Sequence, residues 1–296
     1  MKNKKILIIG SSGFLGTHLV KALYSKNEVT QFDINPPNHD LENIKYIYGS
    51  ILDKTLIEIA VKNVDIVYHF AAMTDIDIVN KNPAQAIEIN IAGTTNILEC
   101  CVKENIERFI FSSSVYVYSI YGGVYKSTKQ ACELLIEDYK KMHGLNYSIL
   151  QLGSVYGPGA KLTNLISRLI YESLVNGEMK HYGTGEEIRQ YIFVKDVINL
   201  AIKIIDETYK NKKVILIGSE SITITELMNE IILLFNSKIK KKYELDDYKI
   251  HYKSSPFDIS TENAIKLNYN NLTKLKYGLV ETINSIKDNL NNKKVI

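Results

Sequence analysis

Two hydrophobic periodicities alternate along the first 153 residues. Short aliphatic runs are typical of strands buried on both faces, and longer stretches with apolar residues every three or four positions are typical of helices. The runs predict strands at residues 6–9, 29–33, 44–48, 64–70, 109–111 and 147–152. The longer stretches predict helices at residues 14–23, 53–61, 83–104 and 125–142. This alternation predicts an α/β fold with a parallel, doubly wound sheet, whose ligands bind at the carboxyl ends of the strands.

The pattern is less regular after Gly157-Pro158-Gly159. It predicts helices at residues 162–175, 196–208, 225–235, 261–267 and 279–289, an extended segment at 180–182 and a strand at 214–217. We expect residues 1–160, joined by elements from about 190–217, to form the main domain. Residues 161–296 would then form mostly a small C-terminal lobe.

Three glycines, Gly10, Gly13 and Gly16, separate the first strand from the first helix. The first allows a sharp exit from the strand, the second allows a pyrophosphate to approach the backbone, and the third allows close packing of the helix. A tight turn that binds nothing could show the same glycines. However, Asp33 ends the second strand about twenty residues later, where a carboxylate can accept hydrogen bonds from a ribose. The context therefore favours a dinucleotide site.

Composition excludes several other classes of protein. The 296 residues are 45% hydrophobic and 23% charged with a net charge of +3, which is ordinary for a soluble globular protein and gives no basic block for nucleic acid. Cys100, Cys101 and Cys132 lack metal-ligand spacing, so we expect free buried thiols in a reducing compartment and no metal site. The apolar run near Met1 is too short for a signal peptide, and no stretch is long enough to span a bilayer. We expect a cytoplasmic protein with no membrane partner.

Tyr125 and Lys129 are four residues apart and share one face of a predicted helix. An ammonium beside a phenol favours the phenolate, and so does the positive charge of an oxidised nicotinamide, so Tyr125 is a candidate general base. Ser114 ends the preceding strand and could bond the same substrate oxygen. In a chain with 20 tyrosines such a pair can arise by chance, but its place directly after a strand that ends in serines is specific.

The sequence resembles the extended short-chain dehydrogenase/reductase family, in its nucleotide-sugar epimerase/dehydratase branch, over nearly the whole chain. The resemblance rests on Gly10-x-x-Gly13-x-x-Gly16, Asp33, His69-Phe70-Ala71-Ala72, Asn90-x-x-Gly93-Thr94-x-Asn96, Ser112-Ser113-Ser114, Tyr125-x-x-x-Lys129, the residues 155–159 and the residues 189–197. It implies a Rossmann-type domain that binds NAD and a C-terminal lobe that binds the substrate.

The resemblance also implies roles for individual residues. Tyr125 would take the proton from a sugar hydroxyl while hydride passes to the nicotinamide. Lys129 would bind the nicotinamide ribose and hold Tyr125 as phenolate, and Ser114 would orient the hydroxyl. Asp33 favours NAD because a carboxylate repels a 2′-phosphate. Arg189 matches the position that holds the nucleotide diphosphate, a role suited to a bidentate guanidinium.

Two sets of ligand contacts are expected. The dinucleotide should contact Gly10, Ser12, Gly13, Phe14, Leu15, Gly16, Asp33, Ile34, Ser50, Ile51, Phe70, Ala71, Ala72, Asn90, Ser112, Tyr125 and Lys129. The sugar nucleotide should contact Met73, Ser114, Tyr116, Tyr125, Ser154 and Arg189. Asp75 and Asp77 are interpreted as part of a solvated loop, and His69 as a packed histidine rather than a catalyst.

The chain departs from the family pattern at several positions. Val115 and Tyr116 stand where 4,6-dehydratases carry an acid, which argues against a dehydratase. Gln151 and Ser154 stand where Arg and Asn are common, and Ser50 replaces an aspartate that contacts the adenine. Residues 253–258 occupy the place of a second phosphate-binding arginine.

We therefore expect an NAD-dependent enzyme that oxidises a ring hydroxyl, at C4, of a nucleotide-activated sugar and acts as an epimerase. A net dehydrogenase or ketoreductase would use the same Ser114, Tyr125 and Lys129. A non-catalytic NAD-binding regulatory protein is the alternative from another class. A homodimer is expected from the resemblance, through the helices at residues 84–104 and 125–143.

Overall fold

The computed structural model describes residues 1–235, 238–244, 264–267 and 271–292. These residues divide into two compact units. The first takes residues 1–152, 198–215 and 264–267, and the second takes residues 153–197, 216–235, 238–244 and 271–292. No helix among the described residues is long and apolar enough to cross a membrane.

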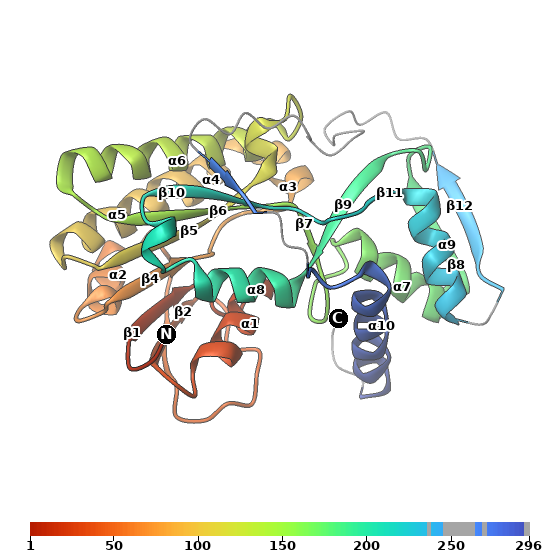
Figure 1. Ribbon diagram of the computed structural model, residues 1–296, viewed down its shortest axis with the longest axis horizontal. Coiled ribbons are helices and arrows are strands. Elements are labelled where there is room, and N and C mark those ends of the chain that lie inside the picture. The colour runs from red at the N-terminus through yellow and green to blue at the C-terminus, as the bar shows by residue number, and fades with distance from the viewer. Residues whose placement is uncertain (236–237, 245–263, 268–270, 293–296) are drawn as a thin grey trace. The chain divides into compact units, whose positions relative to one another are not determined.

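The first unit is built on an eight-stranded sheet (Figure 1). In spatial order its strands are β13 (Ala264–Lys266), β10 (Lys212–Leu216), β6 (Tyr147–Leu152), β5 (Arg108–Ser114), β4 (Ile66–His69), β1 (Lys5–Ile9), β2 (Glu28–Asp33) and β3 (Lys45–Tyr48). The pairs β13–β10, β6–β5, β5–β4, β4–β1, β1–β2 and β2–β3 run parallel. The strand order reverses direction between β1 and β4, which is where doubly wound sheets bind ligands. The predicted fold class is confirmed.

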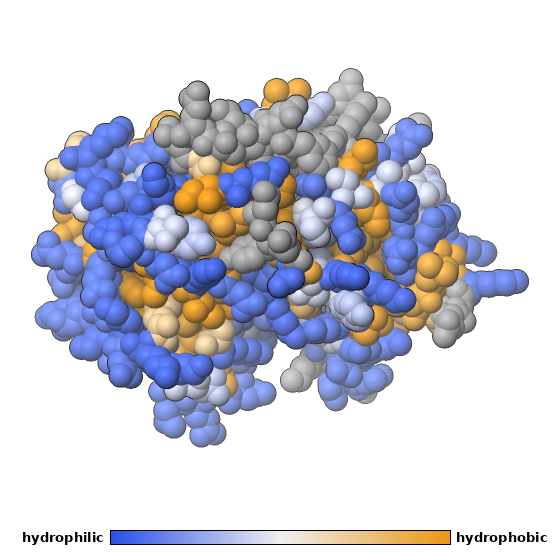
Figure 2. Space-filling model, viewed as in Figure 1, coloured by the Kyte–Doolittle hydropathy of each residue, from blue (hydrophilic) through white to orange (hydrophobic). Residues whose placement is uncertain are grey.

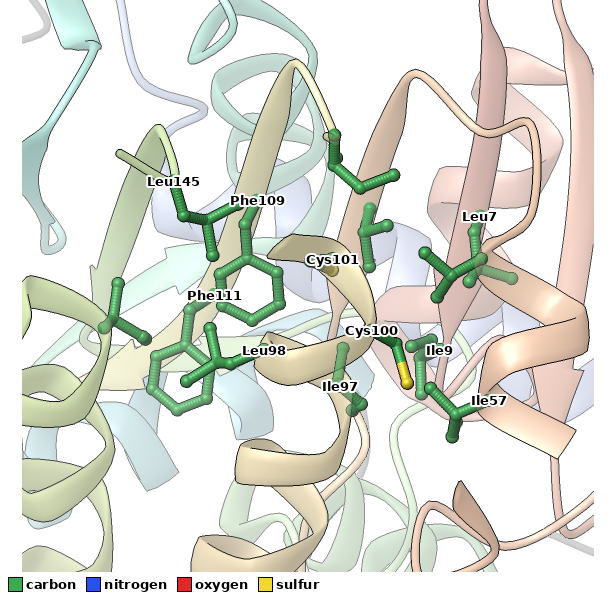
Figure 3. Packing of buried hydrophobic residues seen from close by; sticks show 14 of the residues in the cluster. Leu7, Ile9, Ile57, Ile97, Leu98, Cys100, Cys101, Phe109, Phe111 and Leu145 are labelled. Atoms are coloured by element: carbon green, nitrogen blue, oxygen red, sulfur yellow. The ribbon is translucent and has the colours of Figure 1, made fainter. Parts of the chain in front are cut away.

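Helices cover both faces of this sheet (Figure 1). The first unit contains α1 (Phe14–Leu23), α2 (Lys54–Val61), α3 (Ile76–Lys81), α4 (Pro83–Ile87), α5 (Gly93–Lys103), α6 (Gly123–His143) and most of α8 (Val194–Lys203). Figure 3 shows Leu7 and Ile9 of β1 and Phe109 and Phe111 of β5 gathered around α5. The predicted buried thiols are confirmed, since all three cysteines are free and buried.

The segment predicted as one helix at residues 83–104 is helical, but it consists of two α-helices, α4 and α5, joined by a π-helical turn. Between α4 and α5, residues Glu88–Ala92 form a π-helical turn, η1. Such turns insert one extra residue into a helix and occur frequently at functional sites. Asn90, at the centre of this turn, is 2% exposed.

Several predicted elements were wrong or incomplete. Asp75 and Asp77 do not lie in a solvated loop, because Asp75 caps α3 by accepting a hydrogen bond from Ile78 N at 3.0 Å. A helix was predicted at residues 261–267, but residues 264–266 form a strand, β13, that pairs with β10. Residues 261–263 lie outside the described residues. The helix predicted at 196–208 ends at Lys203 and is followed by a 3₁₀ turn, η3 (Glu207–Tyr209).

In the described residues the second unit combines small sheets with three helices and the first residues of α8. A three-stranded sheet has the order β11 (Ser221–Thr223), β9 (Ile188–Phe193) and β7 (Ser154–Tyr156), and a two-stranded sheet pairs β12 (Lys240–Glu244) with β8 (Glu178–Tyr182). Its helices are α7 (Leu165–Asn176), α9 (Ile224–Phe235) and α10 (Leu275–Asn291). Strand β9 was not predicted, because its mixture of polar and aromatic residues has no clear period. In Figure 2 most of the visible surface is hydrophilic, with apolar side chains in smaller patches.

Candidate active site

The glycine turn between β1 and α1 is shaped by backbone contacts. Gly10 has φ +86°, and a Cβ at this position would lie 2.5 Å from Ala71 N. A Cβ on Gly16 would lie 2.1 Å from Gly10 O, so α1 can pack this closely on the turn only because its residue 16 is a glycine. A Cβ on Gly13 would meet only Gly10 O, at 3.2 Å. No side chain caps α1, so its first N–H groups and the positive end of its dipole can bind a phosphate.

The Asp33 carboxylate at the end of β2 is oriented by the same turn. Its Oδ2 accepts from Ser12 N at 3.0 Å, and its Oδ1 accepts from Asn35 N at 2.9 Å. The Asn35 side-chain amide adds a third hydrogen bond, at 3.3 Å. Since a carboxylate has about four acceptor positions, Asp33 keeps capacity for a ribose hydroxyl. The neighbouring Ile34, also a predicted contact, is 59% exposed. The glycine turn and Asp33 therefore fit a dinucleotide.

The other predicted dinucleotide contacts lie around the carboxyl edge of the sheet. Phe14 and Leu15 are half-buried in the first turn of α1, and Phe70, Ala71 and Ala72 are half-buried after β4. Ser50 Oγ accepts from Leu52 N at 3.2 Å. Ile51 is buried, and a Cβ on Gly93 would lie 2.5 Å from its Cδ1, so α5 packs closely on this loop.

Lys129 is buried beneath the end of β5. Its Nζ donates to Ser112 O at 2.8 Å and lies 4.7 Å from the centroid of the Phe111 ring. Burial lowers the pKa of Lys129 to about 8, although the charges of Cys132 and Glu133 raise this pKa to a smaller extent. The ammonium therefore remains mostly protonated at neutral pH but releases its proton more easily than an exposed lysine.

Tyr125 lies in the first turn of α6 and is 8% exposed. The Tyr116 ring packs edge-on against its ring, with centroids 6.1 Å apart. Tyr116 belongs to the 3₁₀ turn η2 (Val115–Tyr118), which Ser114 caps by accepting from Tyr116 N at 3.3 Å. Tyr116 therefore contacts Tyr125 through the two rings. Lys129 contacts the end of β5, where Ser114 lies, through its hydrogen bond to Ser112 O.

Asn90 connects the segment after β4 to α6. Its Oδ1 accepts from Met73 N at 2.8 Å, and its Nδ2 donates to Met73 O at 3.0 Å and to Thr128 Oγ1 at 3.1 Å. Thr128 Oγ1 in turn donates to Tyr125 O at 2.8 Å. Because both amide hydrogens are used within the protein, Asn90 could contact a dinucleotide only through Oδ1.

His69 is a packed histidine, as predicted. It is 1% exposed, and its Nε2 lies 2.9 Å from Thr94 Oγ1. Burial and, to a smaller extent, the charge of Lys129 lower the pKa of His69 to about 3, so it stays neutral. Among the described residues no three His, Cys, Asp or Glu side chains are grouped closely enough to hold a metal ion.

Sequence reasoning missed a buried polar network behind the Ser112–Ser114 strand end. The Glu133 carboxylate, on α6, accepts from Gln151 Nε2 at 2.9 and 3.0 Å and pairs with Lys213 Nζ at 3.2 Å. Ser113 Oγ also donates to Glu133. Since Gln151 directs its amide hydrogens at Glu133, its Oε1 accepts from Tyr118 Oη at 2.7 Å. Only the tertiary fold brings β10, with Lys213, beside β6, so no local sequence pattern could have revealed the network.

Ser154 and Arg189, the remaining predicted substrate contacts, lie in the second unit. Ser154 begins β7, and its register partner in β9 is Tyr191. Arg189 also lies on β9, where its Nη1 donates to the neighbouring Ile188 O at 3.0 Å. Residues 253–258, predicted to replace a phosphate-binding arginine, lie outside the described residues.

Comparisons with known proteins agree with this geometry. A family model described as the NAD dependent epimerase/dehydratase family matches residues 6–218. UDP-N-acetyl-alpha-D-glucosaminuronate decarboxylase of Bacillus cytotoxicus is 30% identical over 266 residues, covering 80% of this chain and 82% of the relative. A putative UDP-glucose 4-epimerase of Methanocaldococcus jannaschii is 28% identical over 311 residues, covering 96% of this chain and 99% of the relative.

A solved structure is similar over almost its whole length. It is the UDP-N-acetylglucosamine 4-epimerase of Methanobrevibacter ruminantium M1 in complex with UDP-N-acetylmuramic acid, at 27% identity and a TM-score of 0.87. The match covers 97% of this chain and 99% of that chain.

Proposed function

The chain belongs to the NAD dependent epimerase/dehydratase family, and we propose that it is a 4-epimerase of a UDP-activated sugar. The observation that carries this proposal is the grouping at the end of β5, where Lys129 bonds to Ser112 O and Tyr116 packs on Tyr125. The relatives described above support a UDP-sugar as the substrate, because each is named for one.

The residues divide the chemistry between them. NAD, held by the glycine turn at Gly10–Gly16 and by Asp33, would supply the hydride acceptor for the oxidation of the sugar carbon and the hydride donor for its reduction. Tyr125 Oη takes the hydroxyl proton as the ketone forms and gives it back when the ketone is reduced. Ser114 Oγ orients the reacting oxygen. The protonated Lys129 Nζ favours the phenolate of Tyr125. No net oxidation occurs, because one hydride and one proton leave the sugar and both return.

The loop after Ser114 supports an epimerase over a dehydratase. Elimination of water needs an acid beside the catalytic hydroxyls, and this chain has Val115 and Tyr116 there. Val115 is buried, and the Tyr116 ring is packed on Tyr125. Neither side chain can supply a carboxylic acid.

A homodimer and a cytoplasmic location complete the proposal. Ile87 on α4 and Leu134 on α6 are 50% and 60% exposed, so the two helices carry apolar side chains that a second copy could cover. Light scattering at micromolar concentration should give the mass of two chains, and a monomeric mass would contradict the dimer. Three free thiols suit the reducing cytoplasm.

A substrate panel tests the function directly. UDP-glucose, UDP-N-acetylglucosamine and UDP-glucuronate are incubated with the protein, with and without NAD, while NMR follows the sugar and absorbance follows NADH. A C4 epimer without accumulation of NADH is the expected result. Stoichiometric NADH with a keto-sugar would instead indicate a dehydrogenase, and NAD binding without any turnover would favour the regulatory alternative.

The Tyr125→Phe variant tests the catalytic role. It should bind NAD as the wild type does and lose at least about a hundred-fold in kcat, the usual contribution of a general acid–base group. Turnover that is unchanged in this variant would refute the proposed role of Tyr125.

A further inference from the structure

The helix that carries Tyr125 begins without a cap of its own. Gly122 precedes α6 in the left-handed region, with φ +98°, and Gly123 follows with φ +52°. Neither glycine has a side chain that could accept a hydrogen bond from the first N–H groups of the helix. Those N–H groups lack intrahelical acceptors and need partners from elsewhere. Tyr125 is the third residue of α6 and therefore lies within this uncapped turn.

Asn80 supplies the missing cap from another helix. Val124 N donates to Asn80 Oδ1 at 2.9 Å. The Asn80 amide also lies close to the backbone of α6, since a Cβ built on Gly123 would come within 2.2 Å of Oδ1 and 3.0 Å of Nδ2. The absence of a side chain at Gly123 is what allows this contact.

The orientation of the Asn80 amide is fixed on its other side. Its Nδ2 donates to Ile76 O at 2.7 Å, one turn earlier in α3. A carbonyl can only accept, so the amide nitrogen must face Ile76 and the amide oxygen must face Val124. Helix α3 is itself anchored, since Asp75 caps its start and Val79 is fully buried. Asn80 therefore presents a rigid acceptor to the start of α6.

The first turn of α6 is thus held from two sides. Asn80 contacts Gly123 and Val124, while the Tyr116 ring lies over Gly122, where a Cβ would come within 2.6 Å of it. The same Tyr116 ring packs on Tyr125. If the Asn80 contact were lost, the Tyr116 ring and the hydrogen bond from Thr128 Oγ1 to Tyr125 O would remain. Val124 N would lose its acceptor, however, and the first turn could fray enough to shift Tyr125.

We infer that Asn80 is a positioning residue for Tyr125: it caps α6 from α3 and fixes the place of the phenol without touching the substrate. This inference rests on the catalytic role proposed for Tyr125. Displacement of a reacting group by about 1 Å can lower a rate about a hundred-fold, so partial fraying of one turn should cost roughly ten-fold in kcat. KM should change little, because the binding groups elsewhere remain in place.

The experiment compares three variants of the full chain loaded with NAD. Asn80→Ala removes the acceptor. Asn80→Asp loses the donor to Ile76 O but keeps an acceptor for Val124 N, and its negative charge suits the positive end of the helix dipole. The matched control is Asn82→Ala. Asn82 is also an asparagine whose Nδ2 donates to a carbonyl one turn earlier, Ile78 O at 3.0 Å, and no hydrogen bond of its side chain to α6 is described.

Kinetics and amide exchange are measured on each variant. We expect Asn80→Ala to lose about ten-fold in kcat with KM within about two-fold, and Asn80→Asp and Asn82→Ala to stay within about three-fold of wild type. Hydrogen exchange at the Val124 amide, measured without substrate, should accelerate about ten-fold in Asn80→Ala alone. Wild-type kcat in Asn80→Ala, with Tyr125→Phe inactive, would overturn the inference and leave the proposed function standing. Activity in Tyr125→Phe would overturn the proposed function instead, and unchanged exchange at Val124 would overturn the cap itself.

Discussion

Replacing Lys129 with methionine should abolish catalysis and stabilise the fold. Methionine fills nearly the same unbranched volume without a charge. The pKa of Lys129 is about 8 in the fold and 10.5 ordinarily, and each pH unit of this difference corresponds to about 1.4 kcal/mol. Keeping the buried ammonium charged at neutral pH therefore costs roughly 3 kcal/mol. The variant loses the charge-assisted hydrogen bond to Ser112 O, worth about 2 kcal/mol, so the expected net gain is about 1 kcal/mol.

The stability that Lys129→Met gains over the wild type should decrease as the pH rises. Because the pKa of Lys129 is lowered in the fold, the unfolded chain binds more protons than the folded one between about pH 8 and pH 10.5. The wild type therefore gains stability as the pH rises through this window, and the variant does not. The advantage of Lys129→Met should be full at pH 7 and should shrink at pH 9.5.

Urea denaturation of NAD-free protein at pH 7 and pH 9.5 measures this difference. NAD must be removed, because a ligand that binds the folded state adds its own stabilisation. The control is Lys141→Met on the same helix, where the side chain is 73% exposed and the change should stay within about 0.5 kcal/mol. A Lys129→Met protein that is less stable than wild type at pH 7, or an advantage that is equal at both pH values, would refute the reasoning.

Two further changes probe the turn and the buried network. Gly16→Ala should lower the melting temperature and weaken NAD binding at least ten-fold, because its Cβ would meet the rigid Gly10 carbonyl and overpacking costs about 1–3 kcal/mol. Gly13→Ala should weaken NAD binding with a smaller loss of stability, so equal melting temperatures for the two variants would contradict this. Lys213→Met should destabilise the protein by about 3 kcal/mol in urea, since it leaves the buried Glu133 carboxylate without its cation and also removes the ion pair of Lys213 with Glu137. Adding Glu133→Gln should restore most of that loss, and a fully stable Lys213→Met protein would show that the pair is not needed.

The elements that sequence predicted well are those whose signal is local. Strand β6 was predicted with its observed bounds. A helix was predicted to begin at Asp53, and Asp53 is the residue that caps α2. The spacing of the glycines also predicted a tight turn after β1, and Gly10 has φ +86° there, while the dinucleotide contacts of this turn and of Asp33 stay predictions. Each of these features depends on a few neighbouring residues.

The elements that were missed depend on contacts distant in sequence. β13 is a strand because it pairs with β10, although its residues were predicted to be helical. The helix α3 is only six residues long, too short for its apolar period to be recognised before its cap was seen. Lys213 and Asn80 act on α6 from other elements, so nothing near Tyr125 in the sequence indicates them. The roles of Ser114, Tyr125 and Lys129 stay predictions until a substrate is found.

The cation at Glu133 couples two neighbouring strands of the sheet. Its carboxylate needs one positive partner, and in this chain Lys213 provides it from β10 while Gln151 stays neutral. An arginine at position 151 would place a cation on the adjacent strand β6, and Glu133 would then have a charged partner without Lys213. Residues 151 and 213 are therefore coupled through Glu133, because a cation at either position would neutralise its carboxylate. Gln151 also accepts a hydrogen bond from Tyr118 through its amide oxygen, which an arginine could not do. Moving the cation from Lys213 to residue 151 would therefore also remove the hydrogen bond that anchors the turn η2.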